Sequence, residues 1–166
     1  IDRIACYAEK QGITVRTVNL KNLREELYAF MEVYNEAWNE NWGFIPITKE
    51  EIDYMAEKLK PVALSELIIV AEKDSQPVGF FGAIPDFNEV LRKIKGRLTP
   101  LSILKALYYK KKIQSIRLLL FGVKKAFRHK GVESIMIREA FKRAAKHCFK
   151  KCEFSWILED NYETIN

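Results

Sequence analysis

The chain has 166 residues, of which 48% are hydrophobic and 30% are charged, and its formal net charge is +6. This length suits one domain, and the hydrophobic share allows a buried core and excludes an intrinsically disordered chain. No apolar run is long enough to span a bilayer, and the front of the chain carries no signal-peptide pattern. Three cysteines without a paired framework indicate a reducing compartment, so we expect a cytoplasmic protein.

The front of the chain predicts a strand followed by a helix. Residues 1–12 carry little signal, whereas the alternation over 13–20 predicts a strand. Apolar residues at three- and four-residue spacing then predict an amphipathic helix over 23–39. Asn22 and Glu25 have the spacing of a capping box at the start of this helix.

A second helix and a hairpin are expected next. Thr48 and Glu51 form another capping-box pattern, and Pro61 should end the helix that follows them. The apolar runs 66–72 and 78–83 flank a short turn segment, so they predict two antiparallel strands.

We expect a helical insertion over residues 85–113, in which Thr99 caps a helix and Pro100 takes its first position. One face of this helix is apolar, formed by Leu101, Leu104, Leu107 and Tyr108. Its last turn holds Lys110, Lys111 and Lys112, where cations suit the helix dipole. Such a basic helix could lie against a membrane surface. Its length and apolar stripe favour packing on the domain, so no membrane partner is expected.

Positive charge is concentrated in one region. Residues 86–151 hold 19 Lys and Arg against 4 Asp and Glu, whereas the other residues hold 9 against 18. This asymmetry is typical of a region that meets an anionic ligand or surface. A nucleic acid is the usual rival explanation. The lysines fall mostly on predicted helix faces without interleaved aromatic residues, so no nucleic-acid partner is expected, and a solvated surface is the remaining alternative.

The stretch 116–146 predicts a buried strand, a basic turn with one glycine and an amphipathic helix, in that order. The helix has an apolar stripe that repeats every four residues, formed by Met136, Ala140, Ala144 and Cys148, with Ile137 and Phe141 beside it. The residues that lead into the helix are Arg128, His129, Lys130, Gly131, Val132, Glu133 and Ser134.

This turn suits an anion. The first amides of a helix have no partner inside it, and the helix dipole adds about half a positive charge at that end. A phosphate there satisfies several donors at once. Gly131 would let the backbone approach a ligand closely, and Arg128 and Lys130 would add mobile positive charge. The plainer alternative is an ordinary turn with solvated lysines. The turn is neither a Walker A loop nor a dinucleotide fingerprint, because the Gly-Lys-Ser/Thr ending and two of the three glycines are absent.

The run 128–133, Arg-His-Lys-Gly-Val-Glu, resembles the R/Q-x-x-G-x-G/A pyrophosphate loop of GNAT-type N-acetyltransferases. The preceding Phe121-Gly122-Val123 is similar to the end of that family's fourth strand. The segment 155–161 is similar to its fifth strand and the Asn that follows. One departure is Glu133, where the family usually has Gly or Ala. This carboxylate could repel a pyrophosphate or lie on the outer side of the first helical turn.

The resemblance implies an α+β, GNAT-like three-layer fold with a central mixed, mostly antiparallel sheet flanked by helices. It implies acetyl-coenzyme A as co-substrate and no metal. The pantetheine arm would pair with the backbone of Phe121 and Val123, and the pyrophosphate would meet the backbone amides from His129 to Ser134. The cofactor-binding residues implied are Phe121, Val123, Arg128, His129, Lys130, Gly131, Val132, Glu133, Ser134 and Asn161. For Asn161, which would hold a strand-to-helix corner, a plain helix cap is an equal alternative.

The reaction implied is direct transfer of an acetyl group to a primary amine of a small molecule or peptide. No catalytic residue is identified, although Glu159 and Asp160 are candidate bases by their position, with solvated charges as the plainer interpretation. An aromatic wall for the acceptor, or simply core, could be formed by Tyr34, Trp38, Trp42 and Phe44. We expect residues 1–166 to belong to a single GNAT-like domain. Because the family continues with a further helix and strands, we expect this stretch to be a fragment of that domain.

Two other functions remain open. Glu133 and the missing end of the fold also suit a catalytically silent module of the same fold that binds a ligand or acts as a scaffold. A basic nucleic-acid-binding domain is the third possibility. A zinc site at His147, Cys148 and Cys152 is disfavoured, because no second ligand cluster exists.

Overall fold

The computed structural model describes residues 1–41, 43–97 and 99–154. The helices are α1 (Asp2–Lys10), α2 (Leu23–Ala37), α3 (Lys49–Leu59), α4 (Asn88–Lys93), α5 (Pro100–Lys110) and α6 (Val132–Lys146). The strands are β1 (Ile13–Thr17), β2 (Ile68–Lys73), β3 (Gln76–Pro85), β4 (Ser115–Val123) and β5 (Lys151–Phe154). Short 3-10 turns lie at Leu20–Asn22, Ser65–Leu67 and Lys125–Phe127.

The described strands form one sheet in the order β1-β2-β3-β4-β5. The first four pair antiparallel, and β5 joins β4 in parallel. The β2–β3 turn contains Asp74 and Ser75, both with positive φ, which matches the right-handed twist of the strands it connects. The predicted mixed, mostly antiparallel sheet is therefore confirmed.

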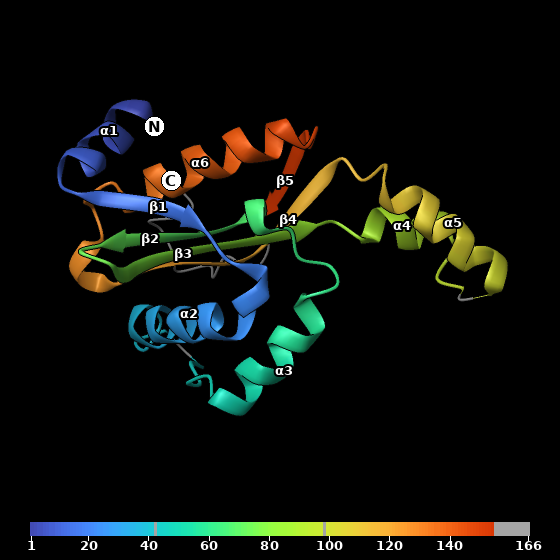
Figure 1. Cartoon of the computed structure of the whole chain (residues 1–166), viewed down its shortest axis with the longest axis horizontal. Coiled ribbons are helices and arrows are strands. Elements are labelled where there is room, and N and C mark those ends of the chain that lie inside the picture. The colour runs from blue at the N-terminus through green and yellow to red at the C-terminus, as the bar shows by residue number, and fades with distance from the viewer. Residues whose placement is uncertain (42, 98, 155–166) are drawn as a thin grey trace.

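Helices cover both faces of the sheet. Figure 1 shows α1 and α6 on one face and α2 and α3 on the other. The α1/α6 face encloses one buried cluster, which includes Ile69, Phe81 and Ile135, and the α2/α3 face encloses a second, which includes Leu27, Phe30 and Ile52. Each face of the sheet thus has its own apolar layer, and the predicted three-layer α+β architecture is confirmed.

Most predicted elements are present, with shifted ends. Thr48 and Glu51 form the predicted capping box. Thr99 accepts a hydrogen bond from the Ser102 amide and Pro100 opens α5, as predicted. The predicted box at Asn22 is wrong, because a 3-10 turn capped by the Asn19 side chain leads directly into α2.

Two helical features differ from expectation. Residues 1–12, which carried little signal, contain α1; its buried residues are Ala5 and Ala8, which are too small to produce an apolar pattern. The predicted stripe of α6 holds at Met136, Ala140 and Ala144, which are buried. It fails at Cys148, which lies beyond the helix and is exposed, and at Phe141, which is 54% exposed.

Two glycines of the central strands, Gly79 of β3 and Gly122 of β4, provide a matched test of the packing of α6. A Cβ on Gly79 would lie 2.9 Å from Met136 Cε and 3.0 Å from Val132 Cγ1, closer than ordinary contact. A Cβ on Gly122 would meet Trp38 and Ala37 at 3.4 and 3.6 Å. Gly79→Ala should therefore lower the free energy of unfolding by roughly 1–2 kcal/mol, and Gly122→Ala should leave it within about 0.5 kcal/mol. Urea denaturation measures both, and equal effects would contradict the packing of α6 on β3.

Candidate functional site

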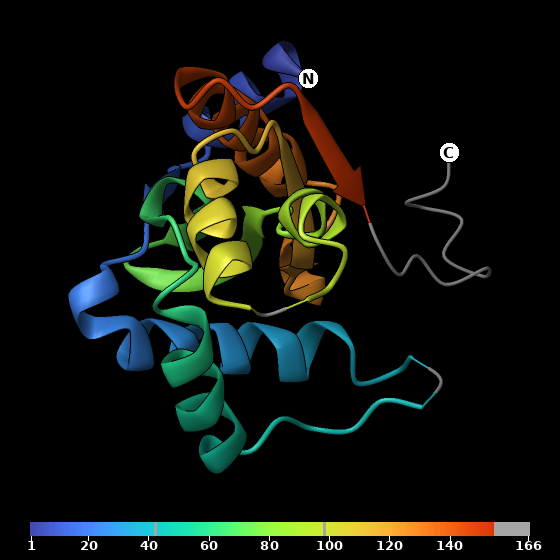
Figure 2. The ribbon, with the colours of Figure 1, turned by 90° about the vertical axis from the view of Figure 1, so that its right-hand side faces the viewer.

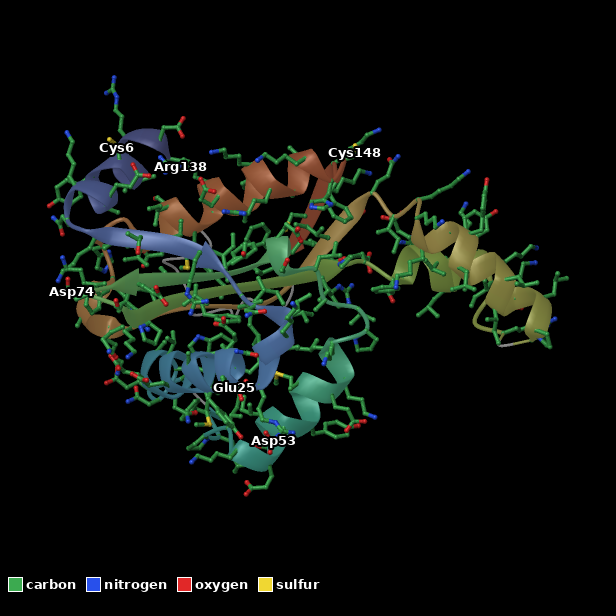
Figure 3. All side chains as sticks on the ribbon, in the orientation of Figure 1. Cys6, Glu25, Asp53, Asp74, Arg138 and Cys148 are labelled. Atoms are coloured by element: carbon green, nitrogen blue, oxygen red, sulfur yellow. The ribbon has the colours of Figure 1, made fainter. Side chains whose placement is uncertain are left out.

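Helix α6 begins where β4 ends, and three residues hold it there. Val132 and Met136 are fully buried and lie over Gly79 of β3. Arg138 forms an ion pair with Glu9 of α1, and Figure 3 shows Arg138 where α6 faces that helix. The start of α6 is therefore held from the sheet side and from the α1 side.

Gly131 packs against α1. Its φ of +82° is left-handed, which disfavours any residue with a Cβ. A Cβ there would lie 2.8 Å from the carbonyl oxygen of Ile4 and 3.3 Å from the Cβ of Ala8. The Cβ position of Gly131 therefore faces α1, and this packing by itself requires a glycine; its predicted approach to a ligand stays a prediction.

The first amides of α6 are available. The first hydrogen bond at this helix start joins the Ile135 amide to the Gly131 carbonyl oxygen. Among the described residues, the amides of Val132, Glu133 and Ser134 have no hydrogen-bond partner. No side chain caps this end either. Three donors and the positive end of the helix dipole therefore converge at the site where an anion was predicted.

The basic side chains of the turn are held more firmly than expected. Arg128 donates to the carbonyl oxygen of Ala37 at 2.6 Å and to that of Val123 at 3.5 Å, so its charge is fixed and not mobile. Lys130 lies over the ring of Phe127, 5.2 Å from its centroid, and is exposed. His129 has a φ of +58°.

The two lysines before the turn pair with carboxylates of α2 and of the segment just after it. Lys124 pairs with Glu32 and Glu36, and Lys125 pairs with Glu40 at 2.6 Å. The hydrogen bond and charge of Lys125 lower the pKa of Glu40. These carboxylates were not predicted as part of the site, although the four-residue spacing of Glu32, Glu36 and Glu40 was visible in the sequence; the first two lie on α2 and Glu40 follows its end.

Beyond Leu118, no described residue pairs with the outer edge of β4. Lys124 N donates to Val78 O, so by the alternation of an antiparallel pair Phe121 and Val123 direct their amides and carbonyl groups away from β3. Described pairing with β5 ends at Leu118. The next residue, Leu119, is the extra residue of a bulge against β3, and a bulge bends its strand.

An apolar hollow of about 120 Å³ lies between α6 and the paired ends of β4 and β5. Its lining includes Phe81, Ile116, Ile137, Phe141, Phe149, Cys152 and Phe154. Burial raises the pKa of the Cys152 thiol, so this sulfur is protonated at neutral pH. The hollow can accept an apolar group, and its lining also includes Lys150 and Lys151.

Three of the four predicted wall residues come together on the other face of the sheet. Tyr34 contacts Trp38 and Phe44, with ring centroids 4.8 and 5.5 Å apart. Burial, and secondarily the charge of Glu51, raise the pKa of Tyr34, so its hydroxyl stays a neutral donor. This cluster adjoins β4, because Trp38 Nε1 lies beside Gly122. Trp42 lies outside the described residues.

Several predicted residues cannot be placed. Asn161, Glu159 and Asp160 all lie beyond residue 154, outside the described part of the chain. Within that part, no cluster of three or more His, Cys, Asp or Glu side chains could hold a metal ion. Cys6 and Cys148 are both exposed and far apart in Figure 3. None of the described helices has the length and hydropathy to cross a bilayer.

Two relatives match nearly the whole chain. It is 30% identical over 161 residues to Protein YghO of Escherichia coli and 31% identical over 156 residues to the Bacterial ceramide synthase of Caulobacter vibrioides. These matches cover 92% and 90% of the chain but only 40% and 41% of the two relatives, so the chain spans about two fifths of their length. No protein-family model matches the chain.

Solved structures with the same fold are acetyltransferases. An N-acetyltransferase of Staphylococcus aureus superposes with a TM-score of 0.61 and 18% identity over 92% of this chain and 78% of its own. The PaiA N-acetyltransferase of Thermoplasma acidophilum, solved with coenzyme A, superposes with a TM-score of 0.54 and 19% sequence identity. This match covers 92% of this chain and 84% of the PaiA chain. A GNAT family acetyltransferase of Staphylococcus aureus superposes with a TM-score of 0.57 and 14% sequence identity over 90% of each chain. The chain therefore has the GNAT fold, as its sequence predicted.

The role of Gly131 can be separated from its backbone conformation. Gly131→Ala should lower the free energy of unfolding by about 2–4 kcal/mol, because a left-handed alanine is strained and its Cβ meets the backbone of α1. Gly96→Ala is the matched control, since Gly96 has a φ of +66° and no atom within 4 Å of its missing Cβ. It should cost only the conformational part, about 1 kcal/mol. Chemical denaturation compares them, and equal costs would refute the contact with α1.

Proposed function

We propose that the chain is an N-acyltransferase domain that moves an acyl group, acetyl in its simplest form, from coenzyme A to a primary amine by direct transfer. One observation carries the proposal. Three amides without a partner among the described residues, of Val132, Glu133 and Ser134, lie beyond the end of β4, and no described residue pairs with the outer edge of β4 after Leu118. The fold shared with acetyltransferases, one of them solved with coenzyme A, supports this proposal.

The described residues fit the cofactor in two places. A diphosphate at the start of α6 would accept from the amides of Val132 to Ser134, beside the charges of Arg128 and Lys130. A pantetheine arm would then run along β4 and pair with the backbone of Phe121 and Val123 as an added strand does. From Val123 back to Leu118 is about 17 Å of strand, which suits the reach of an extended pantetheine arm. Asn161, predicted at the corner near the thioester, is part of this proposal only by resemblance.

The thioester supplies the activated acyl group, and the protein's residues hold the reactants together. The apolar hollow lies near Leu118, at the far end of the proposed arm, where an acyl group would lie. The aromatic cluster of Tyr34, Trp38 and Phe44 flanks β4 from the opposite face and could position the acceptor. Holding donor and amine on one strand lowers the entropic part of the barrier.

The acceptor class is suggested by one relative. A ceramide is the N-acyl derivative of a long-chain amino alcohol, and one of the two matched relatives is named a ceramide synthase. A primary amine on a long apolar chain is therefore the first acceptor to test, ahead of polar amines and peptides. Acetyl-coenzyme A and a long-chain acyl-coenzyme A should be compared as donors.

A silent ligand-binding module is the second candidate. Glu133 places a carboxylate in the first turn of α6, next to the proposed diphosphate. If that charge prevented productive binding, the fold would persist without turnover. Binding of coenzyme A without turnover would distinguish this module from an enzyme.

Ser134→Asp should weaken coenzyme A binding by at least about tenfold, because it places a second carboxylate beside the phosphates. The fold should persist, since an acidic residue in the first turn of a helix is favourable. Ser134→Ala is the matched control and should bind normally. Calorimetric titration with coenzyme A measures binding, and release of free thiol with a long-chain amine measures turnover. Binding without turnover would select the silent module, and no binding by the unaltered protein would refute both.

Glu133→Gln should strengthen coenzyme A binding by roughly three- to tenfold, because it removes a like charge near the diphosphate. The variant should also be slightly less stable, by about 0.3–1 kcal/mol, since it loses a favourable charge at the helix start. Titration at low and high salt measures the first effect. An unchanged or weaker affinity would show that this carboxylate faces away from the ligand.

A further inference from the structure

The insertion between β3 and β4, residues 86–114, extends away from the body of the protein. It contains α4 and α5, which pack on each other. Figure 1 shows both helices beyond the end of the sheet, and Figure 2, which looks onto that end, shows α5 in front with no other helix over it. This end of β4 is opposite to the end that carries the α6 amides.

Helix α5 turns its apolar face to solvent. None of its residues is buried. The side chains that are 50–69% exposed are Leu101, Ile103, Leu104, Leu107 and Tyr108. At 100° per residue they span an arc of about 160°. The less exposed side of the helix is formed by Ser102, Ala106 and Tyr109. The expectation that this apolar stripe packs on the domain is therefore wrong.

The charges of the insertion are one-sided. It holds eight basic residues, Arg92, Lys93, Lys95, Arg97, Lys105, Lys110, Lys111 and Lys112, and two acidic ones. Both carboxylates accept hydrogen bonds from backbone amides of the protein. Asp86 is 6% exposed and accepts from the Asn88 amide, and Glu89 accepts from the amides of Gln114 and Ser115. None of the eight cations forms an ion pair within the described residues.

We propose that this insertion docks the protein on an anionic lipid bilayer, with α5 lying in the plane of the interface. An exposed arc of Leu, Ile and Tyr with lysines on its borders is the pattern of an interfacial helix. Lys105 and Lys110 flank the two sides of the arc, where their stems can lie along apolar surface while their ammonium groups reach headgroups. Each cation near an anionic surface adds attraction.

A lipid surface explains these observations better than a protein partner does. Lysine is depleted in protein–protein interfaces, where the buried core excludes uncompensated charge. Here every border of the apolar arc carries uncompensated cations. A bilayer of anionic lipids satisfies both features at once, since acyl chains accept the leucines and headgroups accept the lysines.

The insertion is anchored well enough to orient the domain. The Asp86 amide donates to Ser115 O at 2.8 Å, and the Glu89 carboxylate accepts from the Ser115 amide at 2.9 Å. Glu89 of α4 and Asp86, just before α4, are thus both bound to the first residue of β4. Docking through α5 would therefore set the direction of β4 relative to the membrane.

Co-sedimentation of the purified protein with vesicles tests the proposal. The protein should bind vesicles of phosphatidylcholine mixed with phosphatidylglycerol, and not phosphatidylcholine alone, with binding weakened by salt. Leu104→Glu with Leu107→Glu should reduce binding by at least about tenfold. The matched control is Ile45→Glu with Tyr54→Glu, which changes two equally exposed apolar residues far from the insertion and should bind normally.

The charge contribution has its own matched pair. Replacing Lys110, Lys111 and Lys112 by Gln should weaken binding roughly a hundredfold, whereas the same change at Lys142, Lys146 and Lys150 should have little effect. Circular dichroism should show folded protein for every variant, since α5 buries no residue. Failure of the unaltered protein to bind anionic vesicles would overturn the proposal. Equal vesicle binding by the Leu104→Glu/Leu107→Glu variant and by the Ile45→Glu/Tyr54→Glu variant would also overturn it. So would a protein that binds no vesicles but forms a dimer that the two leucine substitutions dissociate.

Discussion

The packing of the first turns of α6 determines the geometry of the candidate site. Val132 and Met136 lie on Gly79, where β3 has no side chain, and Gly131 lies against the backbone of α1. Gly79 leaves space for the side chains of Val132 and Met136. Gly131 leaves space for the backbone of α1 and also adopts a left-handed φ. Because α6 is held on two sides, its free amides are directed beyond the end of β4, and an anion bound there would not have to organise them.

The electrostatics of the site come from the backbone more than from the basic side chains. Two lysines before the turn are paired with carboxylates of α2 and of the segment just after it, and Arg128 donates to carbonyl groups. The helix dipole, the free amides and Lys130 remain to attract an anion, and Glu133 opposes them. The largest uncompensated positive charge lies instead in the insertion, at the opposite end of β4. The regional basic charge of the sequence thus corresponds to two separate surfaces.

Elements with strong local signals could be predicted from the sequence. The capping box of Thr48 and Glu51, the Thr99–Pro100 helix start and the strand–turn–helix unit at 116–146 depend on residues close in sequence. What could not be predicted depends on contacts between distant segments. Helix α1 buries alanines only, which produce no pattern, and the side of α5 that packs is set by α4, not by its own leucines. Likewise the position of the turn before α6 was predicted correctly, but Gly131 packs against Ile4, a contact that no local pattern reveals.

The central claim is that the amides at the start of α6 bind the diphosphate of coenzyme A. Titrating the ¹⁵N-labelled protein with coenzyme A while recording amide chemical shifts tests it most directly. We predict the largest shifts at the amides of Val132, Glu133 and Ser134, with smaller ones at Phe121 and Val123. Shifts confined to other segments, or none at saturating cofactor, would contradict the account.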